Sequence, residues 1–327
     1  MAQAIDALAE LVGAEAAHRI VEFRRDMHQH PEIGMDTARA ADKIEAFLQT
    51  LPVEQVHRFA GNGVCAVIRG KKDGPMIGLR ADTDALPIQE ETSVAWKSAI
   101  DKCAHLCGHD GHTAGLLAAA TLLAQTRDFA GSVVLIFQPG EEGWAGADKM
   151  IKDGLFERYP CREVFAIHGA PSRPLGTVAV REGAMTASVN LSATIRTHSP
   201  KVRDKIEARF NEITQGIGTV FGGEVKLDYQ RRYPPQINDP ALVRAILPAL
   251  QSVYGEAGVD TEFAPSMGGE DFALMSEKVP GVYMQVGLGD EGHTAQLHNP
   301  GFDFNDLGLA YAARTFAAIV QERLPLN

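Results

Sequence analysis

Cys103-Ala104-His105-Leu106-Cys107-Gly108-His109-Asp110-Gly111-His112 is the stretch from which the fold and the chemistry of this chain are best understood, and an apolar run of helical spacing follows it. It gathers thiol, imidazole and carboxylate groups, the ligands that divalent transition metals prefer. Cys107 and His109 are separated by one glycine, so both can reach one metal ion from a turn. The stretch therefore predicts a metal site at a strand-to-helix connection, ahead of a helix that begins at Thr113.

Further candidate ligands follow other apolar runs. The pair Glu141-Glu142 comes after a run rich in Val, Leu, Ile and Phe, His168 ends the run 164–167, and His298 lies in the sequence Leu-His-Asn-Pro. Taken singly, each is also consistent with a solvated loop or a hydrogen-bonded structural residue. Because ligands usually bind at the carboxyl ends of strands, their common position after apolar runs favours one site built at strand ends.

Short apolar runs alternate with helical stretches along most of the chain, which predicts an α/β sandwich around a largely parallel or mixed sheet. The predicted strands are 64–68, 76–79, 133–137, 165–167 and 282–286, and the predicted helices include 17–27, 37–51 and 113–124. A one-faced apolar stripe over 200–221, between predicted strands 190–197 and 224–230, predicts a β-α-β insert. The segment Tyr233-Pro234-Pro235 marks the return to the main domain.

The composition narrows the class of partner. The chain has 327 residues, 45% of them hydrophobic, and a formal net charge of -11, which argues against nucleic acid or an anionic membrane as the main partner. Its four cysteines show no disulfide-framework spacing. The N-terminus is acidic and no apolar run is long enough to span a membrane, so we expect a cytoplasmic protein that acts on small molecules or peptides.

Six motifs occur in the order found in one group of enzymes: 24–32, 79–87, 107–113, 137–143, 267–272 and 297–300. The chain thereby resembles the N-acyl-amino-acid amidohydrolases, or hippurate hydrolases, of the aminoacylase and carboxypeptidase superfamily of dinuclear metallopeptidases. The resemblance covers nearly the whole chain. It implies a three-layer α/β/α catalytic domain, residues 1–188 and 233–327, interrupted by a lid or dimerisation domain at 189–232. It also implies hydrolysis of the amide bond of N-acyl or N-aroyl amino acids or small peptides.

The resemblance implies a role for each candidate residue. Cys107 would be the thiolate shared by two divalent ions, whose coordination is completed by His109, Glu142, His168 and His298. Glu141 would be the general base, and Asp82 would orient a metal-bound histidine, with His105, Asp110 and His112 in supporting roles. The mixed sulfur, nitrogen and oxygen ligands suit manganese, zinc, cobalt or nickel. No role follows for Glu270 or Asp271, which could equally be a glycine-turn scaffold.

The chain departs from the family pattern in its lid. The strand that leads into the lid, 186–190, runs directly into 191–197, which matches a strand late in the family's lid, so the opening half and its substrate-binding histidine are absent. A truncated β-α-β lid predicts an open cleft and a monomer or weakened homodimer. Two alternatives stay open: a metal-binding scaffold with little or no catalysis, and a thiol enzyme that uses Cys107. The latter leaves Glu141, Glu142, His168 and His298 unexplained.

Overall fold

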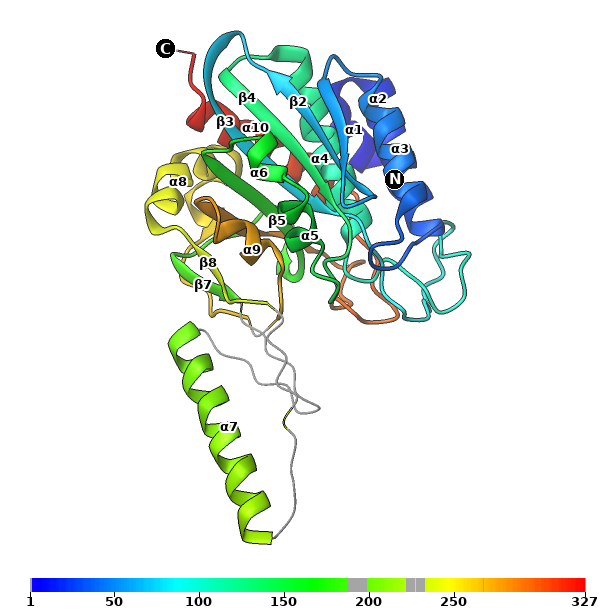
Figure 1. Cartoon of the computed structure of the whole chain (residues 1–327). Coiled ribbons are helices and arrows are strands. Elements are labelled where there is room, and N and C mark those ends of the chain that lie inside the picture. The colour runs from blue at the N-terminus through cyan, green and yellow to red at the C-terminus, as the bar shows by residue number, and fades with distance from the viewer. Residues whose placement is uncertain (1, 187–198, 222–226, 228–232, 267, 327) are drawn as a thin grey trace.

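The computed structural model describes residues 2–186, 199–221, 227, 233–266 and 268–326 (Figure 1). Its helices are α1 (Ala2–Val12), α2 (Ala14–Gln29), α3 (Ala38–Leu48), α4 (His109–Thr126), α5 (Gly146–Lys152), α6 (Leu155–Arg158), α7 (Pro200–Phe221), α8 (Pro240–Tyr254), α9 (Phe272–Ser276) and α10 (Gly308–Arg323). Its strands are β1 (Glu54–Phe59), β2 (Gly63–Arg69), β3 (Lys72–Asp82), β4 (Ala130–Gln138), β5 (Glu163–Pro174), β6 (Val178–Ala179), β7 (Gly183–Thr186), β8 (Gln236–Asn238), β9 (Val259–Asp260) and β10 (Gly281–Gly289). None of the described helices is both long and apolar enough to cross a bilayer.

Eight of these strands form one mixed sheet in the order β1-β2-β4-β3-β5-β10-β6-β9. The central strands β4, β3, β5 and β10 are parallel, whereas β1 and β2 are added at one side by antiparallel pairing. In register, Asp82 lies beside Gln138, and His168 lies beside Gln285. The carboxyl ends of the four central strands therefore meet at one edge, which is where ligands bind in such sheets.

Helices cover both faces of this sheet. On β4, Val133, Leu135 and Phe137 join the hydrophobic core shared with α1, α2, α3, α4, α8 and α10. The alternate residues Val134 and Ile136 join a second core shared with α5, α6 and α9. Because successive side chains of a strand point to opposite faces, a strand that is apolar throughout must be covered on both sides. The three-layer α/β/α architecture is thus confirmed.

The helix that follows the cysteine and histidine stretch begins earlier than predicted. It starts at His109 rather than Thr113, directly after Gly108, whose φ of 88° lies in the left-handed region that favours glycine. The segment His109-Asp110-Gly111-His112 has no apolar period from which a helix could be read. His109 and His112 therefore lie in the first turn of α4 rather than in a loop ahead of it.

The predicted insert is described only in part. Helix α7 spans the predicted 200–221, and the segments beside the insert pair antiparallel as β7 and β8. In Figure 1, α7 extends away from the sheet and its covering helices. The predicted strands 190–197 and 224–230 lie outside the described residues, apart from residue 227. The division into 1–188, 189–232 and 233–327 stays a prediction.

Candidate metal centre and active site

A cavity of about 490 Å³ opens at the carboxyl ends of the central strands. Four of the five predicted metal ligands line it, together with the predicted general base: Cys107, Glu141, Glu142, His168 and His298. The fifth predicted ligand, His109, is fully buried in the first turn of α4. Residues up to 191 positions apart in the sequence are thereby brought to one place.

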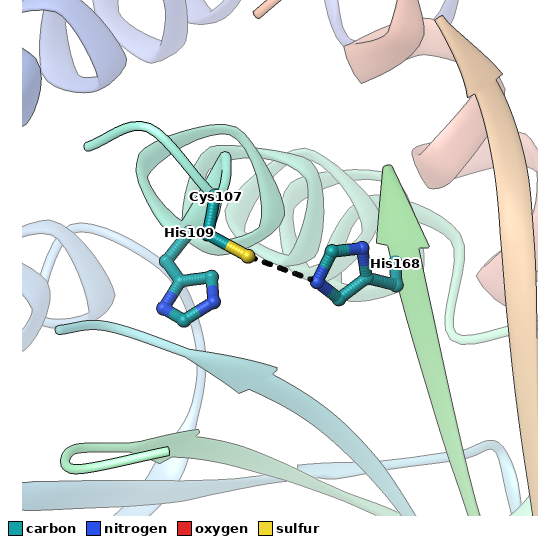
Figure 2. A group of neighbouring side chains, drawn as sticks. All are labelled: Cys107, His109 and His168. Atoms are coloured by element: carbon teal, nitrogen blue, oxygen red, sulfur yellow. Dashed lines mark hydrogen bonds between the residues drawn. The ribbon is translucent and has the colours of Figure 1, made fainter. Parts of the chain in front are cut away.

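Cys107 lies at the centre of this group. Its Sγ atom is 3.4 Å from Nε2 of His168 and 3.3 Å from Nε2 of His298. Figure 2 shows Cys107 and His109 at the start of α4 and His168 on β5, with the thiol directed at the His168 ring. Two sets of potential ligands share the thiol: Cys107, His109 and His168 form one, and Cys107, Glu142 and His298 form the other. In each set the ligand atoms lie within 4.8 Å of one another.

Backbone hydrogen bonds orient two of the imidazoles. Nδ1 of His109 is 2.8 Å from the carbonyl oxygen of Asp84, and Nδ1 of His168 is 2.8 Å from that of Gly169. Because a carbonyl can only accept, each Nδ1 donates, and in the neutral form of each ring Nε2 presents its lone pair to the Cys107 group. This arrangement is typical of histidines that bind metals.

Two buried polar atoms at the centre of the group have no hydrogen-bond partner. They are Nε2 of His109 and Oε1 of Glu142, and they lie 3.9 Å apart. Oε1 of Glu142 forms an ion-pair contact with Nε2 of His298 at 3.4 Å, so its burial is partly offset, whereas Nε2 of His109 has no such contact shorter than 3.7 Å with any described residue. A buried polar atom without a partner costs about 1–3 kcal/mol, more if it is charged, and a bound cation would remove that cost. The residues present therefore fit a metal ion.

Buried carboxyl groups outnumber the guanidinium groups next to the cavity. Burial, together with the charges of Glu270 and Glu142, raises the pKa of Glu141 well above its usual range. Burial raises the pKa of Asp271 to about 7, although the buried Arg80 opposes the shift. Arg80 contacts Asp82, Glu270 and Asp271 at 2.8–3.1 Å. One guanidinium cannot balance all these carboxylates, so a positive charge in the cavity would stabilise them.

Side chains of two other segments hold the backbone around Glu141. Its N–H donates to Oδ1 of Asp84 at 3.0 Å, and its carbonyl oxygen accepts from the Tyr233 hydroxyl at 2.8 Å. The same hydroxyl accepts from the N–H of Ala145 at 3.2 Å. Neither Asp84 nor Tyr233 was predicted as a site residue, although Asp84 belongs to the motif 79–87 and Tyr233 marks the return from the insert.

The sequence predicted that Asp82 orients a metal-bound histidine. Oδ1 of Asp82 lies 2.7 Å from Nδ1 of His112, whereas Oδ2 of Asp82 lies 3.7 Å from Nε2 of His109. Nε2 of His112 accepts from the N–H of Gly169 at 2.8 Å, so both ring nitrogens of His112 are engaged. The hydrogen bond of Asp82 thus supports His112, while the orientation of His109 comes from the carbonyl of Asp84.

Two of the residues predicted to support the metal ligands lie on the other side of α4. Asp110 contacts Arg24 at 3.0 Å and His28 at 2.9 Å, and the ring of His105 lies 6.4 Å from that of His28. Asp110 and His109 are consecutive in a helix, so their side chains diverge by about 100°. The prediction that Asp110 serves the metal site is therefore replaced by a role in this second buried cluster.

Comparison with known proteins agrees with the class that the fold and the site define, a metal-dependent hydrolase of amide bonds. The chain belongs to peptidase family M20/M25/M40, whose model matches residues 78–322. It is 30% identical to N-acetylcysteine deacetylase of Bacillus subtilis, over 92% of this chain and 96% of the relative. It is 27% identical to hippurate hydrolase of Campylobacter jejuni, over 93% of this chain and 96% of that one.

The solved structures show the same relationship. A Bacillus subtilis protein described as a dinuclear metal-binding peptidase of the M20 family superposes with a TM-score of 0.84 and 30% identity. The match covers 93% of this chain and 96% of that protein. The expected family is thus confirmed.

Proposed function

We propose that this protein hydrolyses the amide bond of N-acyl or N-aroyl amino acids, or of small peptides, to a carboxylic acid and a free amine. The observation that carries the proposal is the pair of ligand sets that share the Cys107 thiol beside Glu141. Two relatives support the substrate class, since they are named for N-acetylcysteine and hippurate, both of them N-acyl amino acids.

The residues around the cavity would hold two divalent ions. Cys107 would bind both, with His109 and His168 completing one site and Glu142 and His298 the other. The similar Bacillus subtilis peptidase, which is described as binding a dinuclear metal centre, supports this assignment. Such a pair lowers the pKa of a water molecule and polarises the amide carbonyl. Sulfur, nitrogen and oxygen ligands together suit manganese, zinc, cobalt or nickel.

Glu141 would move the proton. A carboxylate oxygen of Glu141 lies within 4.8 Å of ligand atoms of both His109 and Glu142, so it faces the space where water would attack the amide. In this position it takes the proton of the attacking water and passes it to the leaving nitrogen. Asp84 and Tyr233, which hold its backbone, keep the carboxylate at that distance.

Metal analysis of the purified protein, combined with hydrolysis assays, tests the proposal. The substrates are N-acetyl, N-benzoyl and dipeptide panels, each with and without added manganese, zinc, cobalt or nickel. We expect two equivalents of metal per chain and activity that a chelator removes and metal restores. Two bound equivalents without turnover would favour the scaffold alternative. Activity that resists chelation but is lost on thiol alkylation would favour the thiol enzyme.

We further propose that the insert at 189–232 is a shortened lid and that the protein is a monomer or a weak dimer. The alignment with the Bacillus subtilis deacetylase extends over 372 residues, 45 more than the 327 of this chain, so the relative has segments without a counterpart here. Light scattering that shows a tight dimer at micromolar concentration would contradict the proposal.

A further inference from the structure

One buried aspartate contacts three of the residues to which the proposed function assigns a role. Asp84, which is 1% exposed, follows the end of β3. Its Oδ1 accepts from the N–H of Glu141 at 3.0 Å, and its Oδ2 accepts from the N–H of Glu142 at 3.2 Å. Its carbonyl oxygen accepts from Nδ1 of His109 at 2.8 Å.

The segment that carries the two glutamates lacks regular structure of its own. Strand β4 ends at Gln138 and helix α5 begins at Gly146, so neither a sheet ladder nor helical hydrogen bonds hold the intervening residues. Gly140 and Gly143, with φ of 70° and 89°, turn the chain on either side of the glutamates. Two consecutive N–H groups then point in one direction. A side chain with two acceptor oxygens can satisfy both.

We propose that Asp84 is a positioning residue that sets the carboxylates of Glu141 and Glu142 relative to His109. The backbone N–H groups of Glu141 and Glu142 both donate hydrogen bonds to the carboxylate of Asp84. The carbonyl oxygen of Asp84 accepts from Nδ1 of His109 and so orients its ring. The spacing between the proposed base and two proposed ligands therefore depends on one side chain and its own carbonyl. This inference rests on the proposed function for its catalytic meaning, but its structural part stands without it.

The substitution Asp84→Asn tests the role with little change of shape. An asparagine has one oxygen and one NH₂ group, so it can accept from only one of the two N–H groups and opposes the other. Loss of a hydrogen bond that orients metal ligands typically weakens metal affinity or activity about 10–100-fold. We expect a decrease of that size in kcat and in the affinity for cobalt measured by titration, with KM changed less than kcat. The visible spectrum of the cobalt-loaded protein should also shift.

Asp239→Asn is the matched control. Asp239 caps α8 by accepting one bond, from the N–H of Leu242 at 2.8 Å, and asparagine caps helices equally well. This variant should retain kcat, cobalt affinity and spectrum. If Asp84→Asn behaves like Asp239→Asn in all three measurements, the positioning role is wrong.

Amide hydrogen exchange on the metal-free parent protein decides the structural part independently of activity and of how well the variant folds. The amides of Glu141 and Glu142 should exchange at least tenfold more slowly than in an unstructured peptide. Exchange at the unstructured rate would overturn the proposal. If these amides are protected but the parent protein neither binds metal nor hydrolyses any amide, the proposed function fails while the link from Asp84 to the turn holds.

Discussion

Two buried charged clusters lie on opposite sides of the first turn of α4, and they differ in charge balance. On the side of α2, Arg24 contacts Asp110, Asp303 and Asp306 at 3.0, 2.8 and 3.5 Å. His28 lies between Asp110 and Glu90. Together with Arg25, which contacts Asp306 at 2.7 Å, this cluster supplies three basic side chains for four carboxylates. A cavity of about 310 Å³, lined in part by Arg25, adjoins it and is smaller than the cavity of the proposed active site.

On the side of the cavity, acids outnumber the permanent cations. Arg80 lies within electrostatic reach of four buried carboxylates, Asp82, Glu141, Glu270 and Asp271, whereas Glu142 faces the imidazoles of His109 and His298. Each carboxylate removed from water needs a compensating charge or becomes protonated. The first cluster is largely neutralised by its own basic side chains, whereas the second would be stabilised by added cations. His109 and Asp110 are consecutive residues of α4, and the helix directs one toward each cluster.

Unpartnered atoms alone do not distinguish the clusters. Nδ1 of His105 and Oδ1 of Asp110 lack hydrogen-bond partners on the α2 side, as Nε2 of His109 and Oε1 of Glu142 do at the cavity. What marks the metal site is the combination of unpartnered ligand atoms, excess negative charge and an open volume. The following substitutions test that distinction, in order of expected effect.

Glu141→Gln should give the largest effect on activity. It removes the proton acceptor while leaving the proposed ligands in place, and general-base catalysis typically contributes about 10²–10⁴ in rate. We expect kcat to fall by that factor while metal analysis still finds two equivalents. Loss of metal together with activity would instead place Glu141 among the ligands.

Arg24→Met should give the largest effect on stability. It leaves the buried Asp110 without its guanidinium, and breaking a buried ion pair typically costs about 3–5 kcal/mol. Urea denaturation should show that loss, and the double variant Arg24→Met/Asp110→Asn should recover part of it. Lys71→Met, which breaks an exposed pair with Asp128, is the control and should cost less than about 1 kcal/mol.

The charge balance of the α2 cluster also predicts a pH dependence. Burial would lower the pKa of His28, but the charge of Asp110 and hydrogen bonds to Asp110 and Glu90 outweigh it and raise that pKa to about 9. Protonated His28 therefore stabilises the fold fully below pH 6.5, its ordinary pKa, and the stabilisation is lost as the pH rises through 9. Denaturation of the parent protein should lose up to about 3 kcal/mol across that window. His28→Gln should remove most of this slope.

Tyr233→Phe should give the smallest effect of the four. It removes a donor to the carbonyl of Glu141 and an acceptor for the N–H of Ala145, each worth about 0.5–1.5 kcal/mol. We expect kcat to fall about tenfold and KM to change little. The control Tyr254→Phe removes a hydroxyl that contacts Thr315, and neither residue lines the cavity, so stability should fall while kcat is retained. Equal kinetics in the two variants would show that Tyr233 does not position the base.

Local patterns were sufficient for most of the fold. The apolar run within β4 predicted a strand of an α/β sandwich, and the stripe over 200–221 predicted α7, because strand and helix periods are properties of neighbouring residues. The start of α4 was placed four residues late because polar, metal-binding residues replace the apolar period in its first turn.

The candidate site was predictable in its chemistry and only partly in its geometry. Residue types and motif order identified Cys107, His109, Glu142, His168 and His298, and the structure brings them together. The resemblance assigned Asp110 to the same site, but the helix turns it toward Arg24. Asp84 and Tyr233 were missed because their contacts join segments 57 and 92 residues apart, which no local pattern records.

By itself, the sequence determined the layered α/β architecture and the set of sulfur, nitrogen and oxygen groups available to a metal, since both depend on residue type and short-range periodicity. Only the tertiary structure decided which of those groups share a cavity and which are neutralised elsewhere. The physical reason is that charge balance and hydrogen bonding act through space. His109 and Asp110 are adjacent in the chain, yet they belong to two clusters that differ in charge balance.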